Sequence, residues 1–421
     1  MERFEEVYER LNAAQRRAVD TIYGPVLVIA GPGTGKTQLL SARVAHILRS
    51  IDTLPQNILC LTFTENGALN MRERLSRFIG PHAYDVQIST YHAFGGGLIR
   101  RFPEYFTDIR LERPVDDLGK HQILSRIIDE VPYTSPIKQV RHHLGDLVST
   151  ISEVKRGLLT PKALRQIAKN NLHAIEQTAD SIGDVLAPYA ARMPSKLAIA
   201  LPLWQSILDV LHDSTLVIHD SKTPSLISLA AGTLESALEE AEAAGKTTPL
   251  TKWKNKWLAK AKDNHFILAG SLESRRIAAL AGVLESYQLA LAAEGLYDFD
   301  DMILRAIEVL ETNDDLRFTL QEQYQFVLLD EFQDTNAAQL KLVSLLTDNP
   351  VNEGRPNVLA VGDDDQAIYA FQGAEYSNML DFAQMFRGTE IISLEENYRS
   401  AAPILQTAVA VAGQIEARLL H

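Results

Sequence analysis

The sequence lacks several features that mark whole classes of protein. It has one cysteine, Cys60, so no disulfide can form within the chain, and a reducing compartment suits it. No uncharged run reaches the roughly 18 apolar residues that a membrane span needs. The first ten residues are too charged for the apolar segment of a signal peptide. We therefore expect a cytoplasmic protein that makes no membrane contact, with Cys60 as a buried thiol in the apolar run 58–61.

An excess of positive charge is absent as well. The 421 residues carry 41 Lys and Arg against 54 Asp and Glu, which gives a net charge of −13. This balance at first argues against a polyanionic partner. The first 103 residues, however, hold 12 basic and 9 acidic side chains. Because a local groove rather than the total charge follows a nucleic-acid backbone, the composition leaves DNA binding open.

What the sequence does have is a hydrophobic content of 46% and enough length for two or three domains. Apolar runs alternate with helical periodicity near both ends, as in the β-α-β units of a parallel sheet. The pattern predicts helices at 36–50 and 65–79, and strands at 25–30, 57–63, 326–329, 357–361 and 391–394. A nucleotide-binding domain built from two separate stretches of chain is the simplest interpretation.

Between about 104 and 292 the periodicity is helical. Helices are predicted at 120–130, 138–156 and 274–293, and the Ala- and Glu-rich piece at 234–244 fits a solvated helix or a linker. This middle stretch therefore predicts a helical domain inserted into the nucleotide-binding domain.

A glycine-rich loop follows the first apolar strand. Its residues are Ala30, Gly31, Pro32, Gly33, Thr34, Gly35, Lys36 and Thr37. Glycines let backbone N–H groups point at phosphate oxygens, Lys36 adds a positive charge, and the Thr37 hydroxyl can bind Mg²⁺. Ala30 stands where the common pattern has a glycine. The strand before the loop and the helical spacing after it nevertheless favour a P-loop over a chance glycine-rich turn.

A second apolar strand, at 326–329, ends in Asp330 and Glu331. There Asp330 can hold Mg²⁺ through water, and Glu331 can act as the general base that polarises the attacking water. The alternative is a solvated acidic turn. Together with the P-loop, the pair predicts the two halves of a Mg-nucleotide site.

A third apolar strand, at 358–361, precedes the run Gly362–Tyr369. Gln366 is suited to contact a γ-phosphate or its water, because a neutral amide both donates and accepts hydrogen bonds. Tyr369 and Phe371 could reach outward to stack on bases, or either ring could belong to the core.

Seven motifs in order resemble the UvrD/Rep/PcrA family of superfamily 1 DNA helicases. They are Leu11–Gln15, the P-loop, Leu61–Thr64, Ser89–Phe94, Asp330–Asp334, Gly362–Tyr369 and Glu396–Ser400. The stretch Tyr297–Met302 also resembles that family. The likeness covers the motor residues well and is weak in the helical middle of the chain.

The resemblance implies ATP and Mg²⁺ as cofactors. It implies that Gln15 reads the adenine edge, that Tyr398 stacks on the base, and that Arg399 is one of two arginines reaching the γ-phosphate. Lys36, Thr37, Asp330 and Glu331 match the catalytic set, and Gln366 is similar to the residue that couples the γ-phosphate to DNA.

The resemblance also implies contacts with single-stranded DNA. Phe63, Thr64, His92, Tyr369 and Phe371 fall where the family binds that strand. Stacking contributes about 1–3 kcal/mol per base, so a few such residues would hold a strand despite the acidic balance. For Phe63 and His92 the alternative is an ordinary packed or hydrogen-bonded residue.

The expected fold class is α/β, with the parallel sheet of a RecA-like P-loop NTPase. The expected domains are a first RecA-like domain at 1–103 and 293–387, an all-helical insertion at 104–292, and the truncated start of a second RecA-like domain at 388–421. A second arginine finger would then be missing. We therefore expect weak ATP hydrolysis by this chain alone, and a partner that could supply the C-terminal half of the motor.

The expected function is an ATP-dependent 3′→5′ DNA helicase acting on single strands and on single-strand/duplex junctions. Its polarity is implied by the resemblance alone. One alternative is a catalytically incomplete subunit or fragment that binds ATP and DNA. Another is the motor part of a helicase–nuclease.

The segment Lys252–Lys262 interleaves five lysines with Trp253 and Trp257. On a helix the two tryptophans share one face. They could be core anchors with a solvated lysine rim, or the segment could contact duplex or single-stranded DNA.

Overall fold

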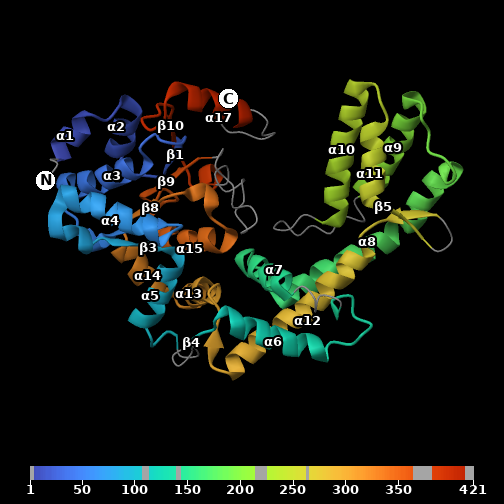
Figure 1. Ribbon diagram of the computed structural model, residues 1–421, viewed down its shortest axis with the longest axis horizontal. Helices are drawn as coiled ribbons and strands as arrows, with labels where there is room; N and C mark the ends of the chain where they lie inside the picture. Colours follow the sequence, from blue (N-terminus) through green and yellow to red (C-terminus); the bar gives the residue numbers. More distant parts are fainter. Residues whose placement is uncertain are drawn as a thin grey trace. The chain divides into compact units, whose positions relative to one another are not determined.

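The computed structural model describes residues 4–106, 113–138, 144–213, 225–261, 265–363 and 382–412 (Figure 1). The chain divides into two compact units, which are described separately below. The first comprises 1–116, 149–158 and 292–421, and the second comprises 117–148 and 159–291.

A six-stranded parallel sheet forms the centre of the first unit, in the order β10-β1-β9-β8-β2-β3. The strands are β1 (Val26–Ala30), β2 (Ile58–Thr62), β3 (Gln87–Thr90), β8 (Phe326–Leu329), β9 (Val358–Gly362) and β10 (Glu390–Leu394). Every residue of β1, β2, β8 and β9 is buried. Burial on both faces explains why these strands appear in the sequence as continuous apolar runs. The predicted parallel sheet is confirmed.

Helices cover both faces of this sheet. One face carries α1 (Phe4–Glu9), α2 (Ala13–Asp20), α3 (Lys36–Ser50) and α4 (Glu65–Ile79). The other carries α5 (Tyr91–Arg101), α13 (Asp301–Thr312), α14 (Asp314–Gln323) and α15 (Ala337–Thr347). A short strand pair, β4 (Arg113–Pro114) with β7 (Leu296–Tyr297), and helix α17 (Ala402–Ala412) belong to the same unit.

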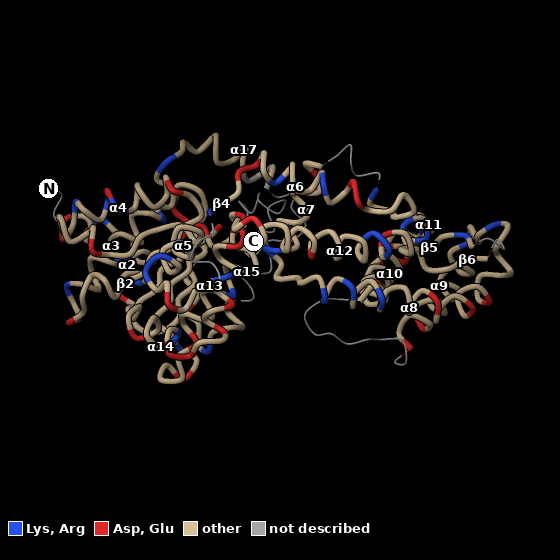
Figure 2. The backbone as a smooth tube through the Cα atoms, turned by 90° about the horizontal axis from the view of Figure 1, so that it is seen from below, with Lys and Arg blue, Asp and Glu red and all other residues tan. Residues whose placement is uncertain are grey.

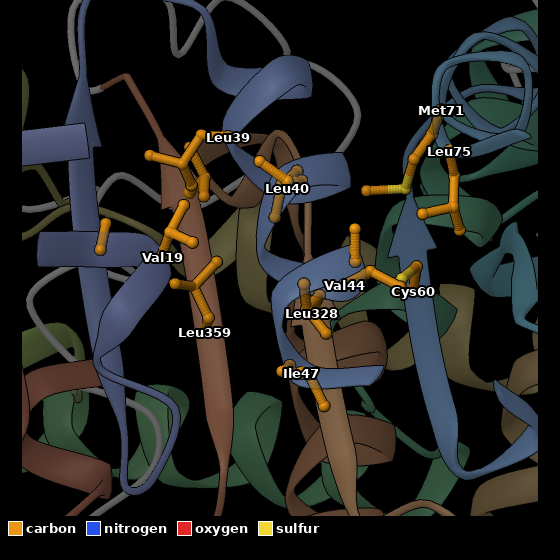
Figure 3. Packing of buried hydrophobic residues seen from close by; sticks show 14 of the residues in the cluster. Val19, Leu39, Leu40, Val44, Ile47, Cys60, Met71, Leu75, Leu328 and Leu359 are labelled. Carbon is orange, nitrogen blue, oxygen red and sulfur yellow. The ribbon is translucent and has the colours of Figure 1, made fainter. Parts of the chain in front are cut away.

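Side chains that alternate along each strand supply the two cores. Val26 and Val28 pack into the core beneath α3, whereas Leu27 and Ile29 pack into the core on the opposite face. Figure 3 shows the α3 side, where leucine, valine and isoleucine side chains of that helix lie over strand residues. Cys60 is buried in this core as predicted, and burial raises the pKa of its thiol.

The second unit is mostly helical. It contains α6 (Asp117–Glu130), the first turn of α7 (Leu144–Arg156), α8 (Pro161–Leu186), α9 (Leu197–His212), α10 (Leu226–Ala244), α11 (Thr248–Trp257) and most of α12 (Ser271–Ala293). A core from α8 to α11 includes Trp204 and Trp253, whose ring centroids lie 5.6 Å apart. The Trp253 Nε1–H donates to the Ala230 carbonyl at 3.0 Å. Trp253 is therefore a core anchor, as one of the two interpretations expected.

The insertion is not all-helical, which corrects the prediction. Strands β5 (Leu258–Lys260) and β6 (Phe266–Leu268) form an antiparallel pair in the second unit. Within the lysine- and tryptophan-containing segment 252–262, helix α11 ends at Trp257. Pairing sets Leu258 opposite Leu268, and both side chains are buried, so the hydrophobic core favours a strand here. The unit begins at 117 rather than at the predicted 104, and residues 149–158 group with the first unit.

The predicted domain boundary at 388 is also corrected. Strand β10 pairs with β1 in parallel register, from Val26 opposite Glu390 to Ala30 opposite Leu394. Leu394 lies in the core beneath α3. Because backbone pairing and core burial join β10 to the first sheet, the strand is part of the first unit rather than the start of a second RecA-like domain.

Membrane-spanning helices were searched for over the described ranges. No helix in them is both long enough and apolar enough to cross a bilayer.

Candidate functional site

The glycine-rich loop joins β1 to α3 at the carboxyl edge of the sheet. Gly33 and Gly35 have φ angles of +73° and +86°, a region that glycine occupies without steric cost. The Thr34 hydroxyl donates to the Gly31 carbonyl at 2.8 Å and closes the turn. Lys36 and Thr37 begin α3, where free backbone N–H groups and the helix dipole favour an anion. The loop therefore has the geometry of a phosphate cradle.

Gln15 approaches this loop from α2. Its side chain and that of Asn12 form a capping box at the start of the helix. The Gln15 Nε2–H donates to the Thr34 carbonyl at 2.8 Å, and the side chain is buried. The structure thus ties Gln15 to the cradle, while its predicted contact with an adenine edge stays a prediction.

Asp330 and Glu331 follow β8 at the same edge of the sheet. Asp330 is buried, and its N–H donates to the Leu61 carbonyl at 2.9 Å. The Lys36 Nζ lies 3.0 Å from the Glu331 Oε2. The two predicted halves of the site therefore meet.

The backbone at Glu331 is strained, with φ 49° and ψ 47°. A non-glycine residue in this left-handed region costs on the order of 1–3 kcal/mol and persists only where its surroundings hold it. The Gln333 Nε2 donates to the Glu331 Oε2 at 2.9 Å, and the Gln333 Oε1 accepts from the Asp363 N–H at 3.0 Å. These bonds help to fix the Glu331 carboxylate beside Lys36.

Burial raises the pKa of Asp330 to about 7; the Glu331 charge adds to this effect, and Lys36 partly opposes it. Burial and Glu331 likewise raise the pKa of Asp334 to about 6. Additional positive charge beside Lys36 would favour the ionised forms of Asp330 and Asp334. The local electrostatics therefore fit a cation.

The donor set fits Mg²⁺. The Thr37 hydroxyl and the Asp330 carboxylate are hard oxygen ligands of the kind Mg²⁺ takes, one or two at a time, together with phosphate oxygens and water. Over the described ranges, no three His, Cys, Asp or Glu side chains gather into a metal site of their own. A Mg²⁺ ion at this edge would thus rely on oxygens of a bound nucleotide.

The segment 396–400 lies against the P-loop. The Asn397 Nδ2 donates to the Pro32 carbonyl, and the Tyr398 N–H donates to the Gly33 carbonyl at 2.9 Å. The Arg399 N–H in turn donates to the Asn397 Oδ1 at 2.8 Å. The structure thus ties this segment to the P-loop, while the contacts of Tyr398 with a base and of Arg399 with a γ-phosphate stay predictions.

A separate cavity of about 230 Å³ opens at the ends of β2 and β3. Phe63, His92, Arg156 and Phe299 are among its lining residues. The rings of His92 and Phe299 stack with centroids 3.9 Å apart, and Phe299 is 51% exposed. Paired rings of this kind offer a flat surface on which a nucleobase can stack.

Comparison with known proteins agrees with this geometry. The family model described as the UvrD/REP helicase N-terminal domain matches residues 11–387. This chain belongs to that family.

Curated relatives of this UvrD/REP helicase domain include three bacterial helicases. The ATP-dependent DNA helicase PcrA of Leuconostoc citreum is 26% identical over 95% of this chain. DNA helicase II of Rickettsia typhi is 28% identical over 94%, and the ATP-dependent DNA helicase Rep of Escherichia coli strain K12 is 27% identical over 95%. The matches cover 39%, 44% and 42% of those proteins respectively. The chain thus spans about two fifths of the length of these relatives.

In this UvrD/REP helicase domain the candidate DNA residues have different surroundings. Phe63 and His92 line the cavity. Thr64 instead caps α4, where its hydroxyl accepts from the Gly67 N–H at 3.0 Å. Burial lowers the pKa of His92 to about 4, although Asp300 opposes the shift, so the ring is neutral near pH 7. Gln366, Tyr369 and Phe371 lie outside the described residues.

Sequence reasoning assigned no role to Phe299. This ring sits on the turn Asp298–Asp301, which is held by a buried lysine. The Lys155 Nζ lies 2.5 Å from the Asp298 Oδ2 and 2.8 Å from the Asp301 Oδ1, with its side chain 1% exposed. The Arg156 Nε adds an ion pair with Asp300 at 2.9 Å. The one sequence signal for Phe299 was its place between Asp298 and Asp300, because an aromatic residue of the core is not expected between two acids.

Proposed function

We propose that this chain is the ATP-binding motor portion of a DNA helicase that hydrolyses ATP to move 3′→5′ along single-stranded DNA and separate duplex. The observation that carries the proposal is the meeting of Lys36 with Glu331 beside Asp330. A cationic loop, a strand-end carboxylate and a candidate general base at one sheet edge are the parts that phosphoryl transfer to water needs.

Each residue of the site takes one role. Lys36 and the P-loop backbone hold the β- and γ-phosphates, while Thr37 and Asp330 hold Mg²⁺, which neutralises charge on those phosphates when bound. When a nucleotide binds, Lys36 leaves Glu331 for the phosphates. The free Glu331 carboxylate then accepts the proton of the attacking water. Gln15 and Tyr398 hold the base, and Arg399 stabilises the γ-phosphate. Gln366 links that phosphate to the DNA side.

The cavity at Phe63 supports DNA as the substrate. Phe63, His92 and Phe299 line one space, and aromatic faces accept any base. Arg156, which is paired with Asp300, and Glu65 also line this cavity. We propose that this cavity holds bases of the single strand at a single-strand/duplex junction. The polarity rests on the family likeness, and the cytoplasmic location stays a prediction.

A second candidate is a subunit that binds ATP and DNA but turns over slowly alone. Arg399 lies in the segment 396–400, which Asn397 and Tyr398 hydrogen-bond to the P-loop. Such arginines contribute about 10³–10⁵ in rate, and they can be supplied in trans. We propose that a partner segment carrying a second arginine raises the activity of this chain.

The test is the ATPase rate of the chain with and without single-stranded DNA, beside binding of a fluorescent ATP analogue. We expect tight analogue binding, weak basal hydrolysis and loss of both in Lys36→Ala. Robust DNA-stimulated hydrolysis would exclude the slow-subunit candidate. If Lys36→Ala bound the analogue as tightly as the parent, the assignment of the nucleotide site would be wrong.

A further inference from the structure

The second unit carries a group of lysines that the proposed motor chemistry does not use. Helix α11 and strand β5 contribute Lys252, Lys254, Lys256 and Lys260, here named the lysine edge. Figure 2 shows basic residues concentrated at these two elements. In the sequence from 245 to 272, Asp263 is the one acidic residue, against six lysines. The lysine edge is therefore a locally positive surface on a chain whose net charge is −13.

Three of the four ammonium groups of the lysine edge lie over aromatic rings. Lys254 and Lys260 place their Nζ atoms 5.7 and 5.5 Å from the centroid of the Phe266 ring. Lys256 lies 5.4 Å from the Trp257 ring. In the described part of the chain, no ion pair joins any of the four lysines to an acid. Their charge thus remains available to an external anion.

The aromatic rings of this region are not placed to stack on bases. Trp253 is buried and bonded to the Ala230 carbonyl, and Phe266 is buried beneath the two lysines. Trp257 is half-buried. Binding of single strands uses exposed rings on which splayed bases stack, whereas duplex phosphates require only positive charge. This arrangement therefore favours duplex over single-stranded DNA.

We propose that the lysine edge binds the phosphate backbone of duplex DNA without reading its sequence. The inference rests on the proposed function, which makes DNA the substrate, and it adds a duplex contact to the single-strand contact at the Phe63 cavity. Lys252, Lys256 and Lys260 are exposed. They would each neutralise a phosphate and release a counterion.

The experiment measures DNA affinity of the full chain by fluorescence anisotropy at several salt concentrations, with a blunt duplex and with oligo-dT. The test variant is Lys252→Ala/Lys256→Ala/Lys260→Ala. The matched control, Lys162→Ala/Lys169→Ala/Lys196→Ala, removes three exposed lysines elsewhere on the same unit. For the duplex, we expect the slope of log affinity against log salt to flatten by about 2–3 in the test variant, since each phosphate contact contributes about 0.9.

The control and a Lys252→Arg/Lys256→Arg/Lys260→Arg variant should keep the slope of the parent. The oligo-dT slope should stay unchanged in every variant. A duplex slope equal to that of the parent in the alanine variant would overturn the inference, as would an equal loss with oligo-dT. If the parent binds oligo-dT but the alanine variant keeps the salt slope of the parent for the duplex, the lysine-edge proposal is wrong and the proposed function still stands. A parent that binds neither DNA refutes the proposed function as well.

Discussion

The Lys36 Nζ lies 3.0 Å from the Glu331 Oε2, although 295 positions separate the two residues in the chain. The contact exists because β1 and β8 run parallel in one sheet, so the loop after one strand and the acids after the other share an edge. In the proposed function, the phosphate of a nucleotide competes with the Glu331 carboxylate for Lys36.

Removing Lys36 should weaken nucleotide binding strongly. We expect Lys36→Ala to lower the affinity for a fluorescent ATP analogue at least about tenfold, which corresponds to about 1.4 kcal/mol, because the loop loses its cation. Lys341→Ala is the matched control, since Lys341 pairs with Glu311 rather than with the P-loop. It should bind like the parent. Equal losses in the two variants would show a general charge effect.

The sequence predicted the P-loop and the acidic strand end because buried parallel strands are continuous apolar runs, and because chemistry-bearing residues follow them directly. It did not predict that β10 joins the same sheet. The sequence pattern of a strand does not show which other strand pairs with it. The pairing of β10 with β1 is what places β10 in this sheet. The β5 strand was missed for a similar reason, since Leu258 is buried through its pairing with Leu268.

The role of Phe299 could not be predicted from its local pattern either. Its position depends on Lys155, which is 143 residues away from Asp298 in the chain. A hydrophobic pattern would assign such a ring to the core, yet the surrounding ion pairs hold it half in solvent. Long-range ion pairs of this kind have no signal in local periodicity.

The raised pKa of Asp330 predicts a pH dependence of stability. Its folded pKa of about 7 exceeds the unfolded value of 3.8, so between these values the folded state binds more protons than the unfolded state. The free energy of unfolding should therefore fall as pH rises from about 4 to 7, by up to a few kcal/mol. Urea unfolding across this range should show a flatter profile for Asp330→Asn.

The matched control for this profile is Asp348→Asn at an exposed position, which should leave the slope unchanged. Because Asp334 also has a raised pKa, Asp330→Asn should reduce the slope without abolishing it. A profile of Asp330→Asn that superimposes on that of the parent would contradict the prediction.

Gly33 should not accept a side chain. Its φ of +73° disfavours one, and a Cβ there would lie 2.7 Å from the Cβ of Arg399. Gly33→Ala should displace the segment 396–400 or distort the cradle, and so lower analogue affinity at least about tenfold. Gly97→Ala is the control, because nothing lies within 4 Å of its Cβ position in helix α5. That variant should bind normally and gain about 0.5–1 kcal/mol in stability.

The buried ion pairs of Lys155 should stabilise the turn that carries Phe299. Asp301 and Asp298 raise the pKa of Lys155 although burial alone would lower it. Lys155→Met would leave both carboxylates buried without a cation, and breaking such a pair costs about 3–5 kcal/mol. Arg305→Ala, which breaks an exposed pair with Glu308, should cost less than about 1 kcal/mol. Urea unfolding measures the loss of stability in both variants, and similar losses would show that Lys155 contributes no more than a surface pair.

If Lys155→Met also weakened oligo-dT binding while analogue binding persisted, the turn would be confirmed as the support for Phe299 at the DNA cavity.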